Sequence, residues 1–259
     1  MTFTLTLVND HGVWQSSDLR LSDPRTGALV DDYSVKHVAF KCPDGSALLT
    51  YAGVGRVGPD HISDGVRSVI RGESYTVDQT LLRMRERATQ DLGNLLFRGN
   101  IAHMFSVGAI SKDFRGVVQI RNFSVTTERG FGPLMREFVT AAQQLPVPSL
   151  GVVIAWPWWV SSADLSLLQK VAPRRPRKPK EFFGVLAGVN ARTAERHPAA
   201  VSRHCVLSYM PRAGGTVTTE SYGFPPGAPN VVAPFILYGI DMTDTMRALM
   251  RVPEDWKGS

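Results

Sequence analysis

Three residues near the start of the chain carry groups that together can attack a carbonyl carbon. They are Thr2, Asp18 and Lys36. Removal of Met1, which we expect because a small residue follows it, gives Thr2 a free α-amine. An α-amine has a pKa of about 7.7–8.0, so near neutral pH it can take the proton of the neighbouring hydroxyl. A threonine activated in this way is a nucleophile for acyl transfer.

A lysine and a carboxylate complete such a site. A lysine held near Thr2 favours the unprotonated amine and stabilises an alkoxide, and a carboxylate keeps that lysine charged and in place. A backbone N–H in a glycine-containing turn stabilises the oxyanion of the tetrahedral intermediate. Gly53, within "AGVG", is a suitable glycine because it lets the backbone approach a substrate closely.

Strand-like segments place these residues at one end of a sheet. The alternating segment 2–8 is followed by a turn and by segment 13–22, which contains Asp18 and pairs back toward Thr2. Segment 33–42 contains Lys36, and segment 47–55 ends at the glycines. The first fifty-five residues therefore predict antiparallel hairpins.

The rest of the chain alternates between helices and strands. We predict helices over 64–72 with Ser63 as the cap, over 76–92 with a capping box from Thr76 to Gln79, and over 132–145, 162–172 and 181–197. The segments predicted as strands are 103–110, 114–125, 149–156, 201–212, 216–224 and 231–240, and a short helix is predicted around Met246. Antiparallel hairpins and helix pairs in separate blocks predict an α+β fold, a four-layer helix–sheet–sheet–helix sandwich.

The residues at the start of the chain resemble a known family. Thr2, "HGV" at 11–13, "SSDLR" at 16–20, "SVKHV" at 34–38 and "YAGVG" at 51–55 are similar to proteasome β-type subunits and, more broadly, to N-terminal-nucleophile hydrolases. The resemblance covers about residues 2–125. It implies Thr2 as nucleophile, Asp18 and Lys36 as the residues that tune it, and Gly53 as the oxyanion donor.

The second half of the chain departs from the family pattern. The family has an aspartate and, three residues later, a serine before a late strand; Ser202 matches the serine, but Ala199 stands where the aspartate would be. "AWPWWVSS" replaces the family's serine–glycine turn, and we assign neither Ser161 nor Ser162 to that serine. We interpret the chain as a single domain over 1–259, with a basic loop insertion at about 172–181 and a C-terminal extension from about 224.

The net charge of +6 comes mostly from one loop. "PRRPRKPK" holds five cations in seven residues, and without them the chain carries +1. Its three prolines keep this loop out of helix and sheet, and it has no aromatic residues for base stacking. We interpret it as a solvated loop; a nucleic-acid-binding module acting through 174–180 is the third hypothesis for function, and it predicts salt-dependent binding.

Other motifs have simpler interpretations. Cys42 and Cys205 match no metal spacing and are expected to be structural thiols. The histidines form no metal-ligand spacing, and we assign them surface or packing roles. "GVGRVG" at 53–58 lacks the residues of a nucleotide loop. The tryptophans around Pro157 (156, 158 and 159) predict core packing, with a subunit interface or a pocket wall as the alternative.

The first functional hypothesis is a proteasome-like threonine protease that cleaves peptide bonds through an acyl-enzyme. The resemblance implies a homo-oligomeric ring, peptide or unfolded-protein substrates, and no cofactor or metal. The alternative is a catalytically inactive, structural subunit of the same fold, which Ala199 favours. No apolar segment reaches the about 20 residues of a membrane span and no secretory signal is evident, so we expect a cytoplasmic protein without membrane or nucleic-acid partners.

Overall fold

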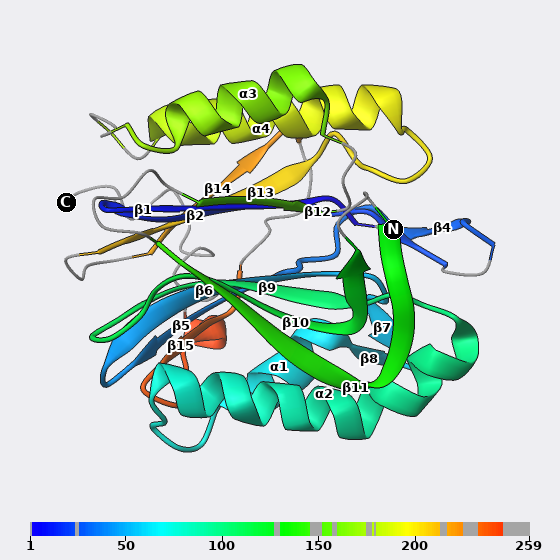
Figure 1. Ribbon diagram of the computed structural model, residues 1–259, viewed down its shortest axis with the longest axis vertical. Helices are drawn as coiled ribbons and strands as arrows, with labels where there is room; N and C mark the ends of the chain where they lie inside the picture. Colours follow the sequence, from blue (N-terminus) through cyan, green and yellow to red (C-terminus); the bar gives the residue numbers. More distant parts are fainter. Residues whose placement is uncertain are drawn as a thin grey trace, which may run out of the picture.

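Two β-sheets face each other in the computed structural model, and helices cover the outer side of each sheet (Figure 1). The structure describes residues 2–23, 26–126, 130–145, 152–156, 160–174, 178, 180–212, 217–224 and 233–245. The mixed α/β composition with antiparallel sheets that the sequence predicts is confirmed, although one strand pair, β15 with β5, is parallel.

The first sheet has five strands in the order β12-β1-β2-β13-β14. Its members are β1 (Thr4–Asn9), β2 (Gly12–Asp18), β12 (Val152–Trp156), β13 (Cys205–Pro211) and β14 (Thr218–Tyr222). All its pairs are antiparallel. The predicted hairpin at the start of the chain is therefore present as β1 and β2.

The second sheet has seven strands in the order β11-β10-β9-β6-β5-β15-β16. Its members are β5 (His37–Cys42), β6 (Gly45–Ala52), β9 (Met104–Ser111), β10 (Arg115–Thr126), β11 (Gly130–Gln144), β15 (Phe235–Leu237) and β16 (Ile240–Asp241). Two small hairpins lie outside both sheets: β3 (Leu21–Ser22) with β4 (Leu29–Asp31), and β7 (Arg56–Val57) with β8 (Asp60–His61).

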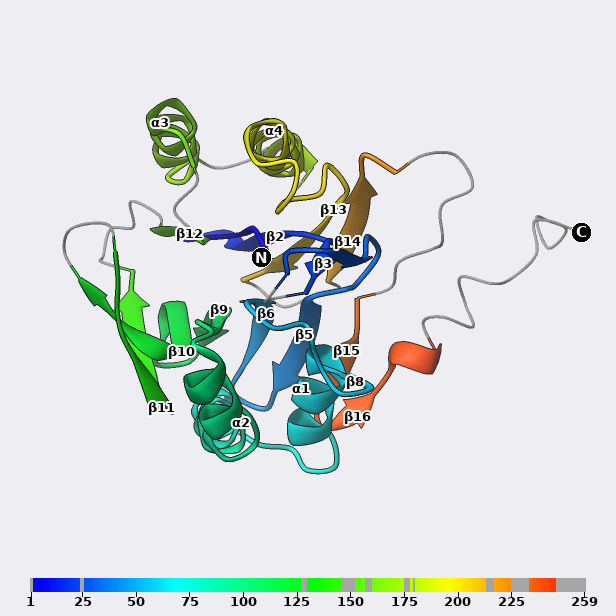
Figure 2. The ribbon, with the colours of Figure 1, turned by 90° about the vertical axis from the view of Figure 1, so that its right-hand side faces the viewer.

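Four α-helices cover the two outer faces: α1 (Ile62–Ile70), α2 (Val77–Gly99), α3 (Ser162–Val171) and α4 (Lys180–Arg196). Figure 2 shows α3 and α4 outside the five-stranded sheet, and α1 and α2 outside the seven-stranded sheet. Each helix pair buries an apolar cluster against its sheet: one around Val77, Leu96 and Phe105, the other around Phe183 and Leu186.

The alternation in "TFTLTLV" has a physical cause that involves both faces of β1. Phe3, Leu5 and Leu7 point into the apolar cluster beneath α3 and α4. Thr4 and Thr6 are also buried, on the face toward the second sheet, where the Thr6 hydroxyl meets the Ser106 hydroxyl at 2.9 Å. The first sheet is thus buried on both sides along this strand.

The helix predicted over 132–145 is wrong, because this segment forms β11. Its apolar residues do recur at helical spacing, but pairing with β10 prevails over that local pattern. The ladder is interrupted between Leu134 and Val139, where four residues of β11 face only Asn122 of β10. Within this bulge, helix α2 supplies the missing acceptor: the Phe138 N–H donates to Thr89 Oγ1 at 2.9 Å.

The helix starts agree with the sequence in one case and differ in another. The capping box of Thr76 and Gln79 is present with both of its hydrogen bonds. The predicted Ser63 cap is wrong, because α1 begins at Ile62 and its N-cap is His61, which makes no side-chain cap hydrogen bond. Ser161 caps α3 by accepting the Asp164 N–H at 3.1 Å.

Two helical glycines are expected to respond to alanine with opposite signs. Gly65 of α1 has open space around its Cβ position, so Gly65→Ala is expected to raise the free energy of unfolding by about 0.5–1 kcal/mol. At Gly93 of α2, a Cβ would collide with the Arg136 carbonyl oxygen of β11, so Gly93→Ala is expected to destabilise despite the better helix propensity of alanine. Urea unfolding of both variants measures this, and stabilisation by Gly93→Ala would contradict the packing of α2 on β11.

Several sequence predictions lie outside the described residues. These are the fate of Met1, the packing of Trp158 and Trp159, the central part of the basic loop (175–177 and 179) and the helix around Met246. Among the described helices, none has the length and apolarity needed to cross a membrane.

Candidate active site

The predicted site residues lie where the two sheets end side by side. Thr2 precedes β1 and Asp18 ends β2, at the same end of the five-stranded sheet because Thr4 pairs with Ser17. Lys36 precedes β5 in the other sheet, and Gly53 follows β6 at the same end because His37 pairs with Thr50. This end of the sheets faces the viewer in Figure 2.

Asp18 is fully buried and accepts hydrogen bonds at both carboxylate oxygens. Oδ1 accepts the Phe3 N–H at 2.8 Å, and Oδ2 accepts the N–H groups of Arg20 at 3.0 Å and Ser202 at 3.2 Å. The Asp18 N–H in turn donates to the Phe3 carbonyl at 3.0 Å. The carboxylate is therefore fixed directly beside the residue that follows Thr2.

Lys36 joins the second sheet to this carboxylate. Its ammonium Nζ lies 3.3 Å from Asp18 Oδ1 and also donates to the Arg20 carbonyl, with neither side chain of the ion pair exposed. Burial lowers the pKa of Lys36 below its ordinary value of 10.5, and the Asp18 charge opposes this shift. The two acceptors use two of the three ammonium N–H donors, and one donor remains for a third group.

Thr2 is only 3% exposed and lies one residue before Phe3, whose N–H is bound to Asp18. The Phe3 backbone is thereby held against β2, which fixes the position of Thr2 just before β1. The structure thus brings Asp18 and Lys36 into direct contact, and Asp18 binds the residue that follows Thr2.

Gly53 adopts a backbone conformation that favours glycine, with φ of +119°. A Cβ at this position would lie 2.6 Å from the Ala102 carbonyl oxygen and 2.7 Å from His103 Nδ1. Extending the β5–β6 register by one residue places Lys36 opposite Tyr51, two residues before Gly53. The glycine turn is therefore close in the sheet to the lysine.

Ser202 contacts Asp18 through its backbone. Its N–H binds Asp18, its hydroxyl accepts the His204 N–H at 3.1 Å, and its carbonyl accepts Asn190 Nδ2 at 2.9 Å. Asn190 is a buried residue of α4, so the helix holds the loop that binds Asp18. Ala199 is exposed in the turn before this loop and provides no carboxylate.

We expect Ser202→Ala to have a small effect, because the Ser202 backbone N–H that binds Asp18 remains. Loss of the hydroxyl removes one hydrogen bond, so the free energy of unfolding is expected to fall by about 1 kcal/mol. The rate at which Thr2 reacts with a peptide electrophile is expected to stay within about threefold of wild type, which is under 0.7 kcal/mol. A much larger loss in this rate would show that the hydroxyl itself takes part.

An open cleft of about 480 Å³ lies beside the Ser202 loop. Two ion pairs line it: Arg20 with Asp32 at 2.8 Å, and Arg203 with Glu195 at 2.7 Å. The hydrogen bond from Arg20 lowers the pKa of Asp32. The carboxylates that border this cleft are thus already engaged by arginines.

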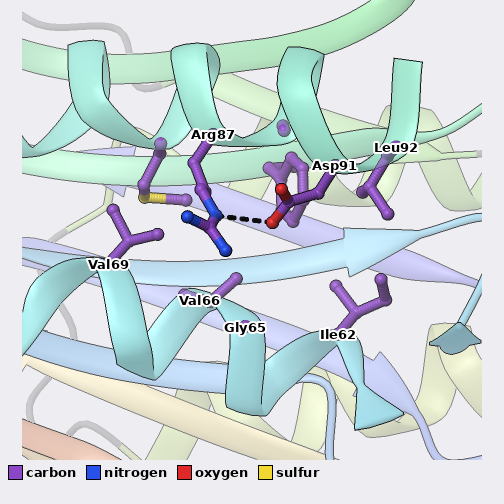
Figure 3. Close-up of a pocket in the computed structure, with 10 residues that line it drawn as sticks. Ile62, Gly65, Val66, Val69, Arg87, Asp91 and Leu92 are labelled. Carbon is purple, nitrogen blue, oxygen red and sulfur yellow. Dashed lines mark hydrogen bonds and ion pairs between the residues drawn. The ribbon is translucent and has the colours of Figure 1, made fainter. Parts of the chain in front are cut away.

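A second cavity, between α1 and α2, does not resemble a catalytic site. It measures about 70 Å³ and is lined mainly by apolar side chains such as Val66, Val69 and Leu92 (Figure 3). The two charged side chains on its wall, Arg87 and Asp91, pair with each other at 2.5 Å. Ligand pockets usually measure about 300–1,000 Å³, so this groove is too small for a peptide.

Sequence reasoning missed two buried polar residues near the site, His103 and Asn190. His103 Nδ1 accepts the Val54 N–H at 3.2 Å, and Asn190 holds the Ser202 loop. Neither belongs to a motif; the only signal is a polar residue within an apolar segment. No group of three or more His, Cys, Asp or Glu residues in the described ranges is arranged to hold a metal ion.

Comparison with known proteins gives a match in structure only. Neither a protein-family model nor a curated protein sequence matches the chain. Three solved structures illustrate the match. The Anbu (Gly-1) mutant from Hyphomicrobium sp. strain MC1 has 15% identity and a TM-score of 0.50, over 98% of this chain and 99% of that chain. Anbu (ancestral beta-subunit) from Yersinia bercovieri has 9% identity and a TM-score of 0.54, over 86% and 89%. The Anbu complex from Pseudomonas aeruginosa, solved as a helical assembly, has 12% identity and a TM-score of 0.54, over 97% of both chains.

These matches show that the chain has the fold of the Anbu structures along nearly its whole length. They support the proteasome-like fold that the sequence predicts. At identities of 9–15% these matches establish the fold alone.

Proposed function

We propose that the protein is a threonine-type N-terminal-nucleophile hydrolase that cleaves peptide bonds in the cytoplasm. One observation carries this proposal: the buried Asp18–Lys36 pair is fixed beside Phe3, the residue that follows Thr2. An ion pair without solvent contact is costly to bury, and such pairs are more often found where chemistry requires a tuned charge. The proposal includes a single domain in the four-layer arrangement of this hydrolase class.

The proposed reaction begins after Met1 is removed. The Thr2 α-amine takes the hydroxyl proton, and Oγ1 attacks the peptide carbonyl to form a tetrahedral intermediate. The Gly53 N–H stabilises its oxyanion, and Lys36 stabilises negative charge on the threonine oxygen. The C–N bond then breaks, the departing amine takes the proton, and an ester-linked acyl-enzyme remains. Water hydrolyses this ester and restores Thr2.

The proposal is tested by turnover of fluorogenic peptide amides with different side chains before the cleaved bond. Wild-type protein is expected to hydrolyse some of them, and Thr2→Ala to hydrolyse none. Thr2→Ser keeps a hydroxyl beside an α-amine and is expected to retain part of the activity. Equal turnover by the wild type and Thr2→Ala would overturn the proposal, because the activity would then come from another residue or a contaminant.

A second candidate is an inactive structural subunit. The exposed Ala199, where the family pattern has an aspartate, favours it. Both candidates include self-association, for which we propose a homo-oligomer; the Pseudomonas Anbu complex is a helical assembly, and the family resemblance implies a ring. Sedimentation measures this state, and assembly of both the wild type and Thr2→Ala without any turnover would favour the structural subunit.

A further inference from the structure

His103 is a buried histidine with a defined contact at the glycine turn. Its ring is enclosed by aromatic side chains, with centroids 5.9 Å from Tyr51 and 4.7 Å from Phe105. Nδ1 accepts the N–H of Val54, the residue directly after Gly53, at 3.2 Å. The histidine therefore holds the peptide bond between Gly53 and Val54 in one orientation.

A neighbouring strand holds His103 itself. The His103 N–H donates to Asn122 Oδ1 at 2.7 Å, and Asn122 Nδ2 donates to the Ile101 carbonyl at 2.9 Å. The Asn122 N–H also donates to the His103 carbonyl at 3.2 Å. Asn122 is the residue of β10 that faces the bulge in β11.

The hydrogen bond to Val54 determines the protonation state of the ring. Nδ1 can accept only when the imidazole is neutral and its proton is on Nε2. Burial lowers the pKa of His103 to about 3, so the ring remains neutral at working pH. Within the described ranges Nε2 has no hydrogen-bond partner, so the hydrogen bond of the His103 ring is the one to the glycine turn.

We propose that His103 is a positioning residue that orients the Gly53 N–H for the oxyanion, an inference that rests on the proposed function. The Gly53 N–H belongs to the Ala52–Gly53 peptide, and His103 holds the next peptide, Gly53–Val54. The two peptides meet at Gly53, whose φ of +119° sets their relative orientation. Ala52, on the other side, is held in the ladder by pairing with Met104. Without the Nδ1 acceptor, the Gly53–Val54 peptide is free to rotate and the donor loses its direction.

Three substitutions at His103 separate this role from simple packing. Asparagine can place Oδ1 near the position of Nδ1, glutamine places its oxygen farther out, and phenylalanine fills the space without an acceptor. We expect His103→Phe and His103→Gln to lower kcat by about 10²–10³-fold, with KM nearly unchanged. The kcat of His103→Asn is expected to be at least about tenfold higher than that of either variant. Rates are normalised to the fraction of Thr2 that reacts with an irreversible electrophile.

The affinity for a peptide boronic acid is a measurement that would stay unchanged if His103 had only a packing role. The boronic acid forms a tetrahedral adduct on a threonine hydroxyl and needs the oxyanion donor, whereas a non-cleavable peptide does not. The boronate affinity of His103→Phe is expected to fall in parallel with kcat, while affinity for the non-cleavable peptide stays unchanged. Ser106→Ala, which removes a buried hydroxyl elsewhere between the sheets, is the matched control and is expected to alter neither.

The outcomes distinguish this inference from the proposed function. A wild type without turnover would refute the proposed function, and the oxyanion role with it. An active wild type with His103→Phe and His103→Gln within twofold of its kcat would overturn the inference alone. Equal losses in His103→Asn and His103→Gln would also overturn it. If His103→Phe does not fold, the comparison of asparagine with glutamine decides.

Discussion

Asp18→Ala is expected to abolish the reaction of Thr2 and to lower the free energy of unfolding by about 3–5 kcal/mol. The substitution removes the acceptor of three backbone N–H groups and of the Lys36 ammonium, all without replacement by water because the carboxylate is fully buried. It also frees the backbone beside Thr2. The rate of labelling by a peptide electrophile measures the loss of Thr2 reactivity, and denaturant unfolding measures the loss of stability.

The double variant Asp18→Ala/Lys36→Met is the control for this prediction. It removes the charge that Asp18→Ala leaves unpaired, so it is expected to be more stable than Asp18→Ala while remaining inactive. Such non-additivity is the signature of a coupled pair. Stability of Asp18→Ala equal to that of wild type would show that the carboxylate is not buried as described.

Lys36→Met is expected to slow labelling of Thr2 by about 10²–10⁴-fold while the protein remains folded. Methionine fills a similar volume without charge, and the Asp18 carboxylate keeps its three backbone N–H donors. These donors compensate part of the charge that Asp18 now carries unpaired, so Lys36→Met is expected to destabilise the protein less than Asp18→Ala does. Labelling at the wild-type rate would show that the lysine has no role in activating Thr2.

The same variant reveals the lowered pKa of Lys36 through pH. Between the lowered pKa in the folded protein and the ordinary value of 10.5, the unfolded chain binds more protons than the folded protein at this residue. The contribution of Lys36 to stability therefore rises with pH in that window. The free energy of unfolding of wild type relative to that of Lys36→Met is therefore expected to increase as the pH rises through this window. A difference that does not change with pH would contradict the lowered pKa of Lys36.

The first hairpin is predictable from the sequence because the local pattern and the tertiary structure agree there. Alternation in "TFTLTLV" and the turn after it specify a hairpin, and the hairpin register brings Asp18 back beside Phe3. The capping box at Thr76 is similarly local. Where such short-range signals coincide with the final pairing, the elements follow; the Asp18–Lys36 contact instead joins two sheets, although the sequence pattern predicts one sheet for both residues.

Other elements and residues depend on contacts between distant parts of the chain, which no local sequence pattern predicts. Residues 132–145 have helical periodicity, but β10 and the edge of α2 hold them as a strand. The role of Asn190 arises because α4 crosses the loop at Ser202, and that of His103 because β9 begins beside the glycine turn. These are partnerships between residues distant in sequence, and single-residue types do not predict them.

Intact-mass analysis of the wild type and Thr2→Ala, before and after treatment with a threonine-directed epoxyketone, tests the central claim most directly. We predict that wild-type protein begins at Thr2 and gains the mass of a single adduct, located on Thr2 by peptide mapping. Thr2→Ala is predicted to gain none. Retention of Met1, or absence of an adduct on correctly processed wild type, would contradict the assignment of Thr2 as the nucleophile.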